Sequence, residues 1–305
     1  MRHRLEYWVL LLLYHFFSSL PYSLIRFIAR CLAGLAFGVF RIRRKVVLIN
    51  MALAFGPGKT YGERLEIARK SYENFGLTLI EILLMKKEMR ASILKNTIID
   101  GLGIIKDAGA GGKGAILVSG HFGNWEKFGF TLSLLGFPVA FVVGRQKNTF
   151  VDRLYNDIRR IYGIEIIPRK RALRRIMEIF RRAETKKFIA ILSDQDAGPS
   201  GLFLPFFTRH ASTPKGAAAF ALKADVPLIY GYGLPVDGRK KLRCRFEKIT
   251  FPLSGNSDAD AASAMQGFNT LLEETIRRNP EHYFWMHRRW KTRPPDETPD
   301  KRIYP

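Results

Sequence analysis

A histidine and a glutamate flank a glycine turn directly after a short apolar run. The run AILV (residues 115–118) continues into SGHFGNWEK, which contains His121 and, five residues later, Glu126. On one continuous helix, residues five apart lie about 140° apart around the axis, so these two side chains could not meet. The segment must therefore turn between them, and Gly120 and Gly123 permit the turn.

The turn predicts where both side chains lie. Asn124 is a natural N-cap, so we expect a helix to begin at Trp125, with Glu126 in its first turn. Glu126 can then reach back to one imidazole nitrogen of His121, fixing the tautomer and stabilising the imidazolium as it forms. The other nitrogen would face the crevice at the strand end, where α/β sheets bind ligands.

An imidazole in this position is suited to remove a proton from a hydroxyl group, because its ordinary pKa lies near neutrality. A substrate alcohol would then be the nucleophile, and no serine or cysteine of the chain need be acylated. The alternative is that His121 only closes the turn while Glu126 complements the helix dipole. The glycine turn after a buried strand favours catalysis over that alternative.

Three other short motifs could bind phosphate or metal. GPGKT (residues 56–60) ends like a phosphate-binding loop, but Leu53 stands where that pattern has its first glycine, so a turn is expected. GAGGKG (residues 109–114) lacks a strand–helix context and predicts a flexible entry to the next strand. DQD, from Asp194 to Asp196, could hold a divalent metal at a strand end, as in some sugar transferases.

The composition indicates a folded, strongly basic chain. Its 305 residues are 47% hydrophobic, enough for one substantial core, and its formal net charge is +23. Like charges repel in a compact fold, so this charge indicates an anionic partner such as a phospholipid surface, a phosphorylated substrate or nucleic acid. Cys31 and Cys244 provide neither a disulfide framework nor a zinc site, and both are expected to be buried thiols.

The N-terminal run from Trp8 to Ile25 is uncharged apart from His15 and approaches the ~20 residues of a membrane-spanning helix. More positive charge follows the run than precedes it, which would keep the rest of the chain cytoplasmic if the run spans. We expect residues 1–40 to attach the protein to a membrane, spanning it or lying in its interface, and residues 41–305 to form the catalytic domain. A helix buried in a soluble core is the alternative.

Farther along the chain, helical and strand patterns alternate. Apolar residues at steps of three and four predict helix over 61–87, and a last helix is expected over 260–278. The alternation predicts an α/β layer structure. The predicted strands are residues 115–119, 139–144, 164–168, 188–194, 226–234 and 242–251, with a polar helix before the third and a very basic helix before the fourth.

SGHFGNWE resembles the HX4D/E motif of the lipid A biosynthesis lauroyl/myristoyl acyltransferase family, part of the bacterial lysophospholipid-acyltransferase-like superfamily. Other blocks resemble that family's later motifs in the same order, so the similarity covers most of the chain beyond the N-terminal segment. These blocks are ENFGLTLIE (residues 73–81), VVGRQKN (142–148), DQDAGPSGLFLPFFTRHASTPKGAAAFALK (194–223) and PEHYFWMHRRWKTRP (280–294).

The resemblance implies a mixed sheet flanked by helices, as in glycerolipid acyltransferases, with an apolar membrane-attaching helix at the N-terminus. It implies transfer of a fatty acyl chain from an acyl carrier protein thioester to a hydroxyl of a lipid A precursor, at the cytoplasmic face of the bacterial inner membrane. This is a late acylation in lipopolysaccharide biosynthesis that needs no metal or cofactor. A related branch acylates phosphatidylinositol mannosides from coenzyme A donors, so donor and acceptor stay open.

The resemblance also assigns roles to residues. His121 would be the general base and Glu126, an aspartate in some members, its partner. Arg145 would stabilise an oxyanion or hold a substrate phosphate, with a plain surface cation as the alternative. Asp194 and Asp196 would organise their loop or meet arginines. The residues expected to bind substrate are Arg145, Asn148, Asp194, Asp196, Arg288 and Arg289.

Two basic clusters could receive the acidic carrier protein or lipid phosphates, and a solvated face beside anionic lipid is an equal alternative. The clusters are Arg169, Lys170, Arg171, Arg174 and Arg175, and then Arg288, Arg289, Lys291 and Arg293. A membrane-tethered nucleic-acid binder could use the same residues but leaves the SGHFGNWE turn unexplained. A metal-dependent sugar transferase built on DQD is a second rival. Acyl length and acceptor position stay open, in part because Thr208 to His210 depart from the family's pattern.

Overall fold

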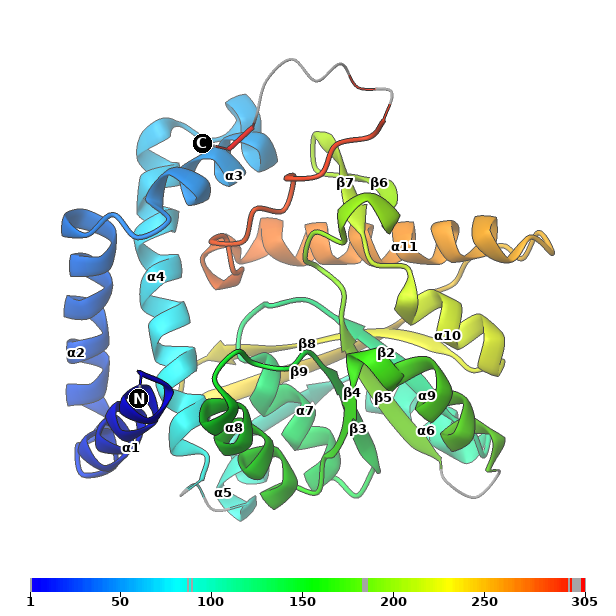
Figure 1. The fold of residues 1–305 in the computed structure, drawn as a ribbon, viewed down its shortest axis with the longest axis horizontal. Helices are drawn as coiled ribbons and strands as arrows, with labels where there is room; N and C mark the ends of the chain where they lie inside the picture. Colours follow the sequence, from blue (N-terminus) through cyan, green and yellow to red (C-terminus); the bar gives the residue numbers. More distant parts are fainter. Residues whose placement is uncertain are drawn as a thin grey trace.

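The computed structural model describes residues 2–86, 88, 90–182, 186–295, 297 and 303–304. A seven-stranded sheet, ordered β1-β9-β8-β2-β5-β3-β4, lies at the centre of these residues with helices against both faces (Figure 1). Every neighbouring pair is parallel except β8 and β9. The predicted mixed α/β fold is confirmed.

The predicted strands correspond to β2, β3, β4, β5, β8 and β9, while β1 and a separate antiparallel hairpin, β6 and β7, were not predicted. The bounds are β1 (Thr97–Asp100), β2 (Gly114–Ser119), β3 (Val139–Val143), β4 (Glu165–Pro168), β5 (Lys187–Leu192), β6 (Leu202–Phe206), β7 (Arg209–Thr213), β8 (Leu228–Val236) and β9 (Lys241–Lys248).

The long predicted helices form close to their expected bounds, each with a capping side chain at its start. Thr60 and Glu63 make a capping box at α4, and the Asn124 side chain accepts a hydrogen bond of 3.0 Å from the Lys127 amide at α7. The helices are α1 (Arg2–Ser18), α2 (Tyr22–Gly34), α3 (Arg44–Phe55), α4 (Tyr61–Leu84), α5 (Arg90–Lys95), α6 (Leu102–Ala110), α7 (Trp125–Leu134), α8 (Thr149–Ile161), α9 (Ala172–Arg181), α10 (Gly216–Ala224) and α11 (Ser257–Arg278).

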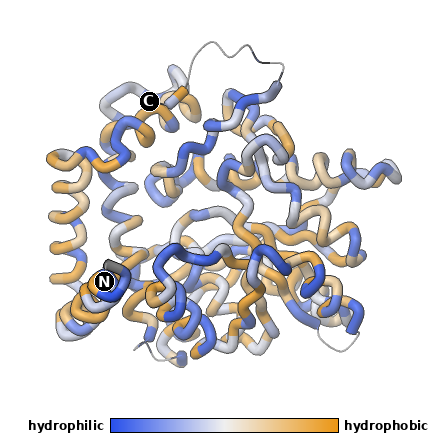
Figure 2. Tube along the Cα trace, viewed as in Figure 1, coloured by the Kyte–Doolittle hydropathy of each residue, from blue (hydrophilic) through white to orange (hydrophobic). Residues whose placement is uncertain are grey.

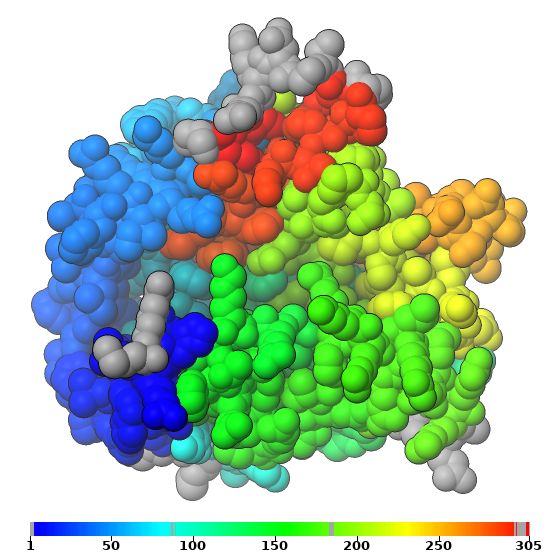
Figure 3. Space-filling model, in the orientation of Figure 1, coloured from blue at the N-terminus to red at the C-terminus, as the bar shows by residue number. Residues whose placement is uncertain are grey.

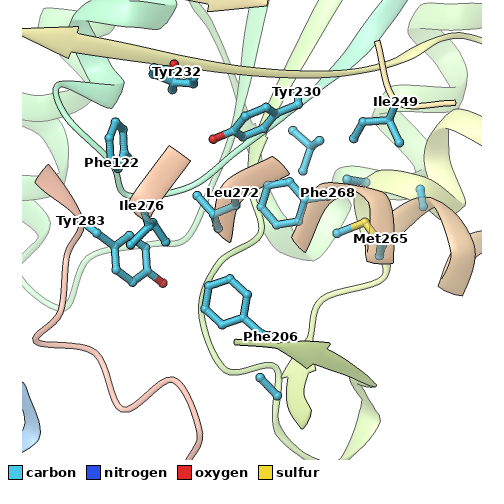
Figure 4. Close-up of a cluster of buried hydrophobic side chains, with 14 of the residues drawn as sticks. Phe122, Phe206, Tyr230, Tyr232, Ile249, Met265, Phe268, Leu272, Ile276 and Tyr283 are labelled. Atoms are coloured by element: carbon cyan, nitrogen blue, oxygen red, sulfur yellow. The ribbon is translucent and has the colours of Figure 1, made fainter. Parts of the chain in front are cut away.

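Strand β2 is buried on both faces, which explains its apolar run from Ala115 to Val118. Ala115 and Leu117 pack into the cluster formed with α6, α7 and α8, whereas Ile116 and Val118 pack into the cluster formed with α9, α10 and α11. Figure 4 shows the second cluster, where α11 side chains such as Phe268 lie against β8. This central strand is therefore a rigid base for the turn that follows it.

An apolar N-terminal helix is present as predicted, but the run from Trp8 to Ile25 is divided between two helices. Helix α1 ends at Ser18 and α2 begins at Tyr22, because Pro21 takes the N-cap position, where its missing amide costs no helical hydrogen bond. Among the described residues, the helical stretch whose length and composition would allow it to cross a membrane is Tyr22–Val39, which ends in a π-helical turn. It is a candidate membrane-attaching segment.

Helices α1 and α2 pack on α4 with one apolar side and expose another. Phe17, Ile25 and Ala29 form a small buried cluster with Leu77 of α4. Figure 2 shows the apolar character of both helices at the edge of the molecule. Cys31 on α2 is exposed, contrary to expectation, whereas Cys244 on β9 is buried. Large apolar side chains exposed on the two helices include Leu5, Trp8, Leu12, Phe16, Leu24, Phe27 and Leu32.

Candidate active site

Strands β2 and β5 place His121 and Asp194 side by side. The two strands are parallel neighbours in which Ser119 pairs with Leu192, and His121 and Asp194 each lie two residues beyond that pair. The pairing continues past the strand ends, since the Ser193 amide donates to the Ser119 carbonyl over 2.9 Å. The register of one strand pair thus brings a histidine and an aspartate together at the carboxyl edge of the sheet.

The carboxylate of Asp194 holds His121 at two points. Its Oδ1 lies 2.7 Å from His121 Nδ1, and its Oδ2 accepts a hydrogen bond of 2.8 Å from the His121 backbone amide. Asp194 is only 2% exposed. The imidazole is therefore fixed in orientation, with Nδ1 facing the carboxylate.

The pair is electrostatically coupled. Burial alone would lower the pKa of His121, but the charge and hydrogen bond of Asp194 outweigh burial and raise that pKa above its ordinary value, with a smaller contribution from the charge of Glu126. Burial alone would raise the pKa of Asp194, but the interaction with His121 lowers it below its ordinary value. The carboxylate therefore stays ionised and favours the imidazolium.

The other imidazole nitrogen, Nε2, is available for chemistry. Within the described part of the chain it makes no hydrogen bond to the protein, and the His121 side chain is 21% exposed. The rings of Trp125 and Phe284 lie beside the imidazole, with centroids 5.2 and 6.1 Å from its own. A neutral His121 that donates from Nδ1 to Asp194 presents an unshared electron pair at Nε2, beside an apolar wall.

Glu126 does not bind His121, which corrects the predicted pairing. Its carboxylate lies in the first turn of α7 and meets Arg159 of α8, whose Nε donates to Oε2 over 3.1 Å and whose Nη2 donates to Oε1. Both side chains are largely buried. The sequence argument identified the correct helix start, but Asp194 from the neighbouring strand already occupies Nδ1.

An apolar cavity lies beside the Glu126–Arg159 ion pair. Its lining comes from α7, α8, β2, β3 and β5, and among the described lining residues Glu126 and Arg159 are the charged ones. Its wall runs from Ser119, two residues before His121, into the interior of the sheet. The apolar lining includes Leu117, Phe128, Phe141, Val143, Ala190 and Ile191.

The backbone of the turn is clamped from two sides. The amide of Gly123 donates to the His282 carbonyl and the amide of Asn124 donates to the Gly233 carbonyl of β8, each over 2.9 Å. Gly123 has φ of +60°, and a Cβ there would lie 2.0 Å from the Gly233 carbonyl oxygen. Glycine is required here both for its backbone conformation and for this close approach.

Three other predicted site residues, Arg145, Asn148 and Asp196, lie in different environments. Arg145 is exposed in the loop after β3, at the same sheet edge as His121. Asn148 caps α8 and its amide donates to the His3 carbonyl and to Glu6. Asp196 accepts hydrogen bonds from the backbone and hydroxyl of Thr292. The structure therefore brings Asp194 to His121, and gives Asn148 and Asp196 internal partners.

The second predicted basic cluster is not a continuous exposed surface. Arg289 is 1% exposed, and its guanidinium donates to the Ser212 carbonyl and to the Thr213 hydroxyl of β7. Arg288 lies over the ring of Tyr304, with its guanidinium carbon 5.9 Å from the ring centroid. The expected surface role of Arg289 is thus replaced by a role in joining the C-terminal segment to the β6–β7 hairpin.

The first basic cluster is partly paired. Arg174 binds Glu178, and Arg175 binds Glu165 and Glu178. Figure 3 shows the surface hollowed between the green part of the chain, which includes this cluster, and the orange to red C-terminal part.

Within the described residues, no group of three or more histidines, cysteines or carboxylates is placed to hold a metal ion.

Sequence reasoning missed two functional candidates. Arg159 lies in a helix rich in charged residues, where nothing distinguished it from the solvated arginines around it. His287 lies in the C-terminal block, and its Nε2 accepts a hydrogen bond of 2.9 Å from the Asp196 amide. Burial lowers the pKa of His287 below its ordinary value.

The fold places a histidine–aspartate pair at the strand ends of an α/β sheet, and comparison with known proteins defines the family. The model of the bacterial lipid A biosynthesis acyltransferase family matches residues 1–292. The chain belongs to this family and is an acyltransferase, which confirms the resemblance seen in the sequence.

Two lipid A biosynthesis acyltransferases match nearly the whole chain, and a third relative matches part of it. The chain is 28% identical to the lipid A biosynthesis lauroyltransferase of Escherichia coli K12, over 90% of this chain and 88% of that protein. It is 24% identical to the lipid A biosynthesis palmitoleoyltransferase of the same strain, over 92% of this chain and 89% of that protein. A phosphatidylinositol mannoside acyltransferase of Mycobacterium tuberculosis is 24% identical over 63% of this chain and 60% of that protein.

Proposed function

We propose that this acyltransferase moves a fatty acyl chain from an acyl carrier protein thioester to a hydroxyl of a lipid A precursor, with His121 as the general base. The observation that carries the proposal is the His121–Asp194 pair at the sheet edge of a chain in the lipid A acyltransferase family. Neither a cofactor nor a metal takes part, because a thioester is already activated toward an alcohol.

In the proposed reaction, Nε2 of His121 takes the proton of the acceptor hydroxyl as that oxygen attacks the thioester carbonyl. The tetrahedral intermediate collapses, an ester bond forms, and the carbon–sulfur bond breaks. The imidazolium returns its proton to the thiolate leaving group. Asp194 keeps the imidazole oriented and offsets the positive charge that it gains, so the base is restored after each turnover.

The Glu126–Arg159 ion pair has a supporting role in this proposal. The charge of Glu126 helps to raise the pKa of His121, although the two side chains are not hydrogen-bonded. The pair also contributes the charged part of the lining of the small apolar cavity beside α7. In this proposal Arg145, which is exposed at the same sheet edge, would meet the oxyanion or a substrate phosphate.

The proposed location is the bacterial inner membrane, with the catalytic domain in the cytoplasm. The exposed apolar side chains of α1 and α2 would attach the protein to the bilayer, and the net charge of +23 would draw it to anionic lipid and to the acidic carrier protein. No nucleic-acid partner enters this account.

A second acceptor class is kept because a phosphatidylinositol mannoside acyltransferase is among the relatives. The match to that protein covers 63% of this chain, against 90% for the lauroyltransferase, which favours the lipid A precursor. The alternative is therefore transfer from acyl-coenzyme A to a mannosylated phosphatidylinositol.

A test uses the purified full chain in detergent with acyl carrier protein or coenzyme A carrying a labelled fatty acyl group. Each donor is offered with a lipid A precursor and with a phosphatidylinositol mannoside, and the products are identified by mass spectrometry. We expect the acylated lipid A precursor to form fastest from the carrier protein. Faster acylation of the mannoside from coenzyme A would replace the proposed function with the alternative. In cells, loss of the gene should remove one acyl chain from lipid A, and the intact chain should restore it.

A further inference from the structure

A cavity adjoining the N-terminal helices is separate from the imidazole and has no role in the proposed reaction. It has a volume of about 720 Å³ and lies between the α1–α2 connection, the end of α4 and the turn between β8 and β9. This volume falls within the range of ~300–1,000 Å³ typical of small-molecule sites. His121 and Asp194 are not among its lining residues.

One part of the cavity wall is apolar and lies directly behind the exposed helices. Phe17 and Ile25 come from α1 and α2, and Leu84 comes from the end of α4. Phe17 and Ile25 are buried, so the apolar wall is on the body side of helices whose other side exposes residues such as Trp8 and Phe27. A hydrocarbon chain entering from the surface covered by α1 and α2 would meet an apolar wall here.

The polar part of the cavity is charged, but its carboxylates are already neutralised. Glu81 receives two hydrogen bonds from Arg239, of 2.7 and 2.8 Å, and others from Tyr22 and Asn124. Glu88 forms an ion pair of 2.6 Å with Lys127. Burial alone would raise the pKa of Glu81, but Arg239 lowers it below its ordinary value, so this network holds no spare charge.

Two lysines give the cavity an excess of positive charge. Lys240 and Lys241 line it from the β8–β9 turn, and both are exposed, which places them at its opening. Among the described residues, no carboxylate lies within ion-pair distance of either ammonium group. The opening therefore offers two cations to an anionic head group, next to an apolar wall for a chain.

We propose that this cavity binds an anionic phospholipid of the membrane, with its phosphate at Lys240 and Lys241 and an acyl chain against Phe17, Ile25 and Leu84. The lipid would join α2 to the β8–β9 turn, which already touch where Arg26 donates to the Gly238 carbonyl. This inference shares with the proposed function the placement of α1 and α2 at the membrane, but it requires neither acyl donor nor acceptor.

The test measures lipid binding by native mass spectrometry of the full chain in detergent. The probes are dioctanoyl phosphatidylglycerol, dioctanoyl phosphatidylcholine and glycerol 1-phosphate. We expect one phosphatidylglycerol to bind, at least about tenfold more tightly than phosphatidylcholine. Lys240→Ala/Lys241→Ala should remove that preference, because each lysine near a lipid phosphate contributes on the order of a few-fold in affinity. The matched control is Lys106→Ala/Lys248→Ala, which removes two exposed charges elsewhere and should bind like the unaltered chain.

Leu84→Trp fills the apolar end of the cavity without changing its charge, and should weaken both lipids. Equal binding of the two lipids by the unaltered chain would overturn the proposal without any variant. Equal losses in the two lysine variants, or competition by glycerol 1-phosphate at the same concentrations as the lipid, would overturn it too. So would displacement of the lipid by the lipid A precursor, which would make the cavity an acceptor site. If the unaltered chain binds the lipid but transfers no acyl group, this result would count against the proposed function and leave the lipid site standing.

Discussion

At the scale of single residues, His121 depends on a partner supplied by another strand. Asp194 holds both the ring and the backbone amide of His121, and it outweighs the effect of burial on the pKa of the imidazole. A general base must be neutral to accept a proton, so activity should be present above this raised pKa and be lost as the pH falls through it.

Asp194→Asn should therefore change the pH profile as well as the rate. The substitution removes the charge that raises the pKa of His121, so the acidic limb of kcat/KM should move to lower pH. The turnover number should fall by roughly 100- to 10,000-fold because the imidazole loses its oriented tautomer. Steady-state rates between pH 5 and 9 check both effects. If the acidic limb of kcat/KM stayed at the same pH in this variant, Asp194 would have no part in the proton-transfer step.

Glu126→Gln should behave differently, because Glu126 stabilises Arg159 and acts on His121 only at a distance. Breaking a largely buried ion pair on one side should cost about 2 kcal/mol or more in the free energy of unfolding. Glu126→Asp keeps the charge and serves as the control. Urea unfolding and a pH profile measure the outcome. A shift of the acidic limb as large as that of Asp194→Asn would restore Glu126 as the direct partner of His121.

The sequence predicted the capping residue Asn124 correctly and located His121 in the turn after β2, but it did not predict which side chain the histidine meets. Asp194 was recognised as a strand-end residue, yet its strand, β5, is separated from β2 along the chain by β3 and β4. Local pattern predicts a strand, whereas the order of strands in a sheet depends on packing across the whole domain. The structure was needed to show that β2 and β5 are neighbours, and therefore that His121 and Asp194 meet.

At the scale of elements, the turn that carries His121 is positioned by β2 and by the backbone hydrogen bonds of Gly123 and Asn124. Gly123→Ala should displace the turn, since its Cβ would lie 2.0 Å from the Gly233 carbonyl oxygen. We expect a loss of at least about 2 kcal/mol in the free energy of unfolding. Gly136→Ala is a matched control, because Gly136 also has positive φ but nothing lies within 4 Å of the added methyl. Similar losses by urea denaturation in both variants would show that the close approach does not matter.

Long periodic elements were predictable, whereas some of the short ones were not. Helix α4 was recognised by its apolar spacing, and β2 by its continuous apolar run. Strand β1 has only four residues, and β6 contains Pro205, so neither carries a strong strand pattern. The break between α1 and α2 was also missed, because apolar composition continues through Pro21 while the helix does not.

At the scale of the whole molecule, the proposed membrane attachment depends on the outward faces of α1 and α2. Deleting these helices would also expose Leu77 and remove a partner of Glu81. Substituting four exposed side chains with glutamine is therefore the cleaner test. The four are Trp8, Leu12, Phe27 and Leu32.

The four-residue variant should move from the membrane to the soluble fraction and keep its far-ultraviolet circular dichroism, because these side chains contribute little to the core. The control substitutes the exposed Tyr61 and Leu253, which lie outside α1 and α2, and should stay with the membrane. Fractionation in low and high salt measures the outcome. Continued membrane binding of the four-residue variant in high salt would contradict attachment through α1 and α2.

The stability of the whole fold should fall in mild acid because of His282. Burial lowers the pKa of this histidine to about 4, so the unfolded chain binds a proton below pH ~6.5 that the folded chain does not. The free energy of unfolding should therefore drop by up to roughly 3 kcal/mol as the pH falls from ~6.5 to ~4. His282→Gln should flatten this part of the curve in urea titrations. An equally steep curve in that variant would assign the acid sensitivity to other groups.

The central claim, that His121 and Asp194 act as one base, is tested most directly by acyl transfer rates of His121→Ala, Asp194→Asn and the double variant. His121→Ala should lower the turnover number by about 100- to 10,000-fold with unchanged circular dichroism, because the turn depends on its glycines and on Asn124. Since both residues serve one proton transfer, the double variant should be little slower than His121→Ala. Near-normal turnover by a folded His121→Ala protein, or multiplicative losses in the double variant, would contradict the account.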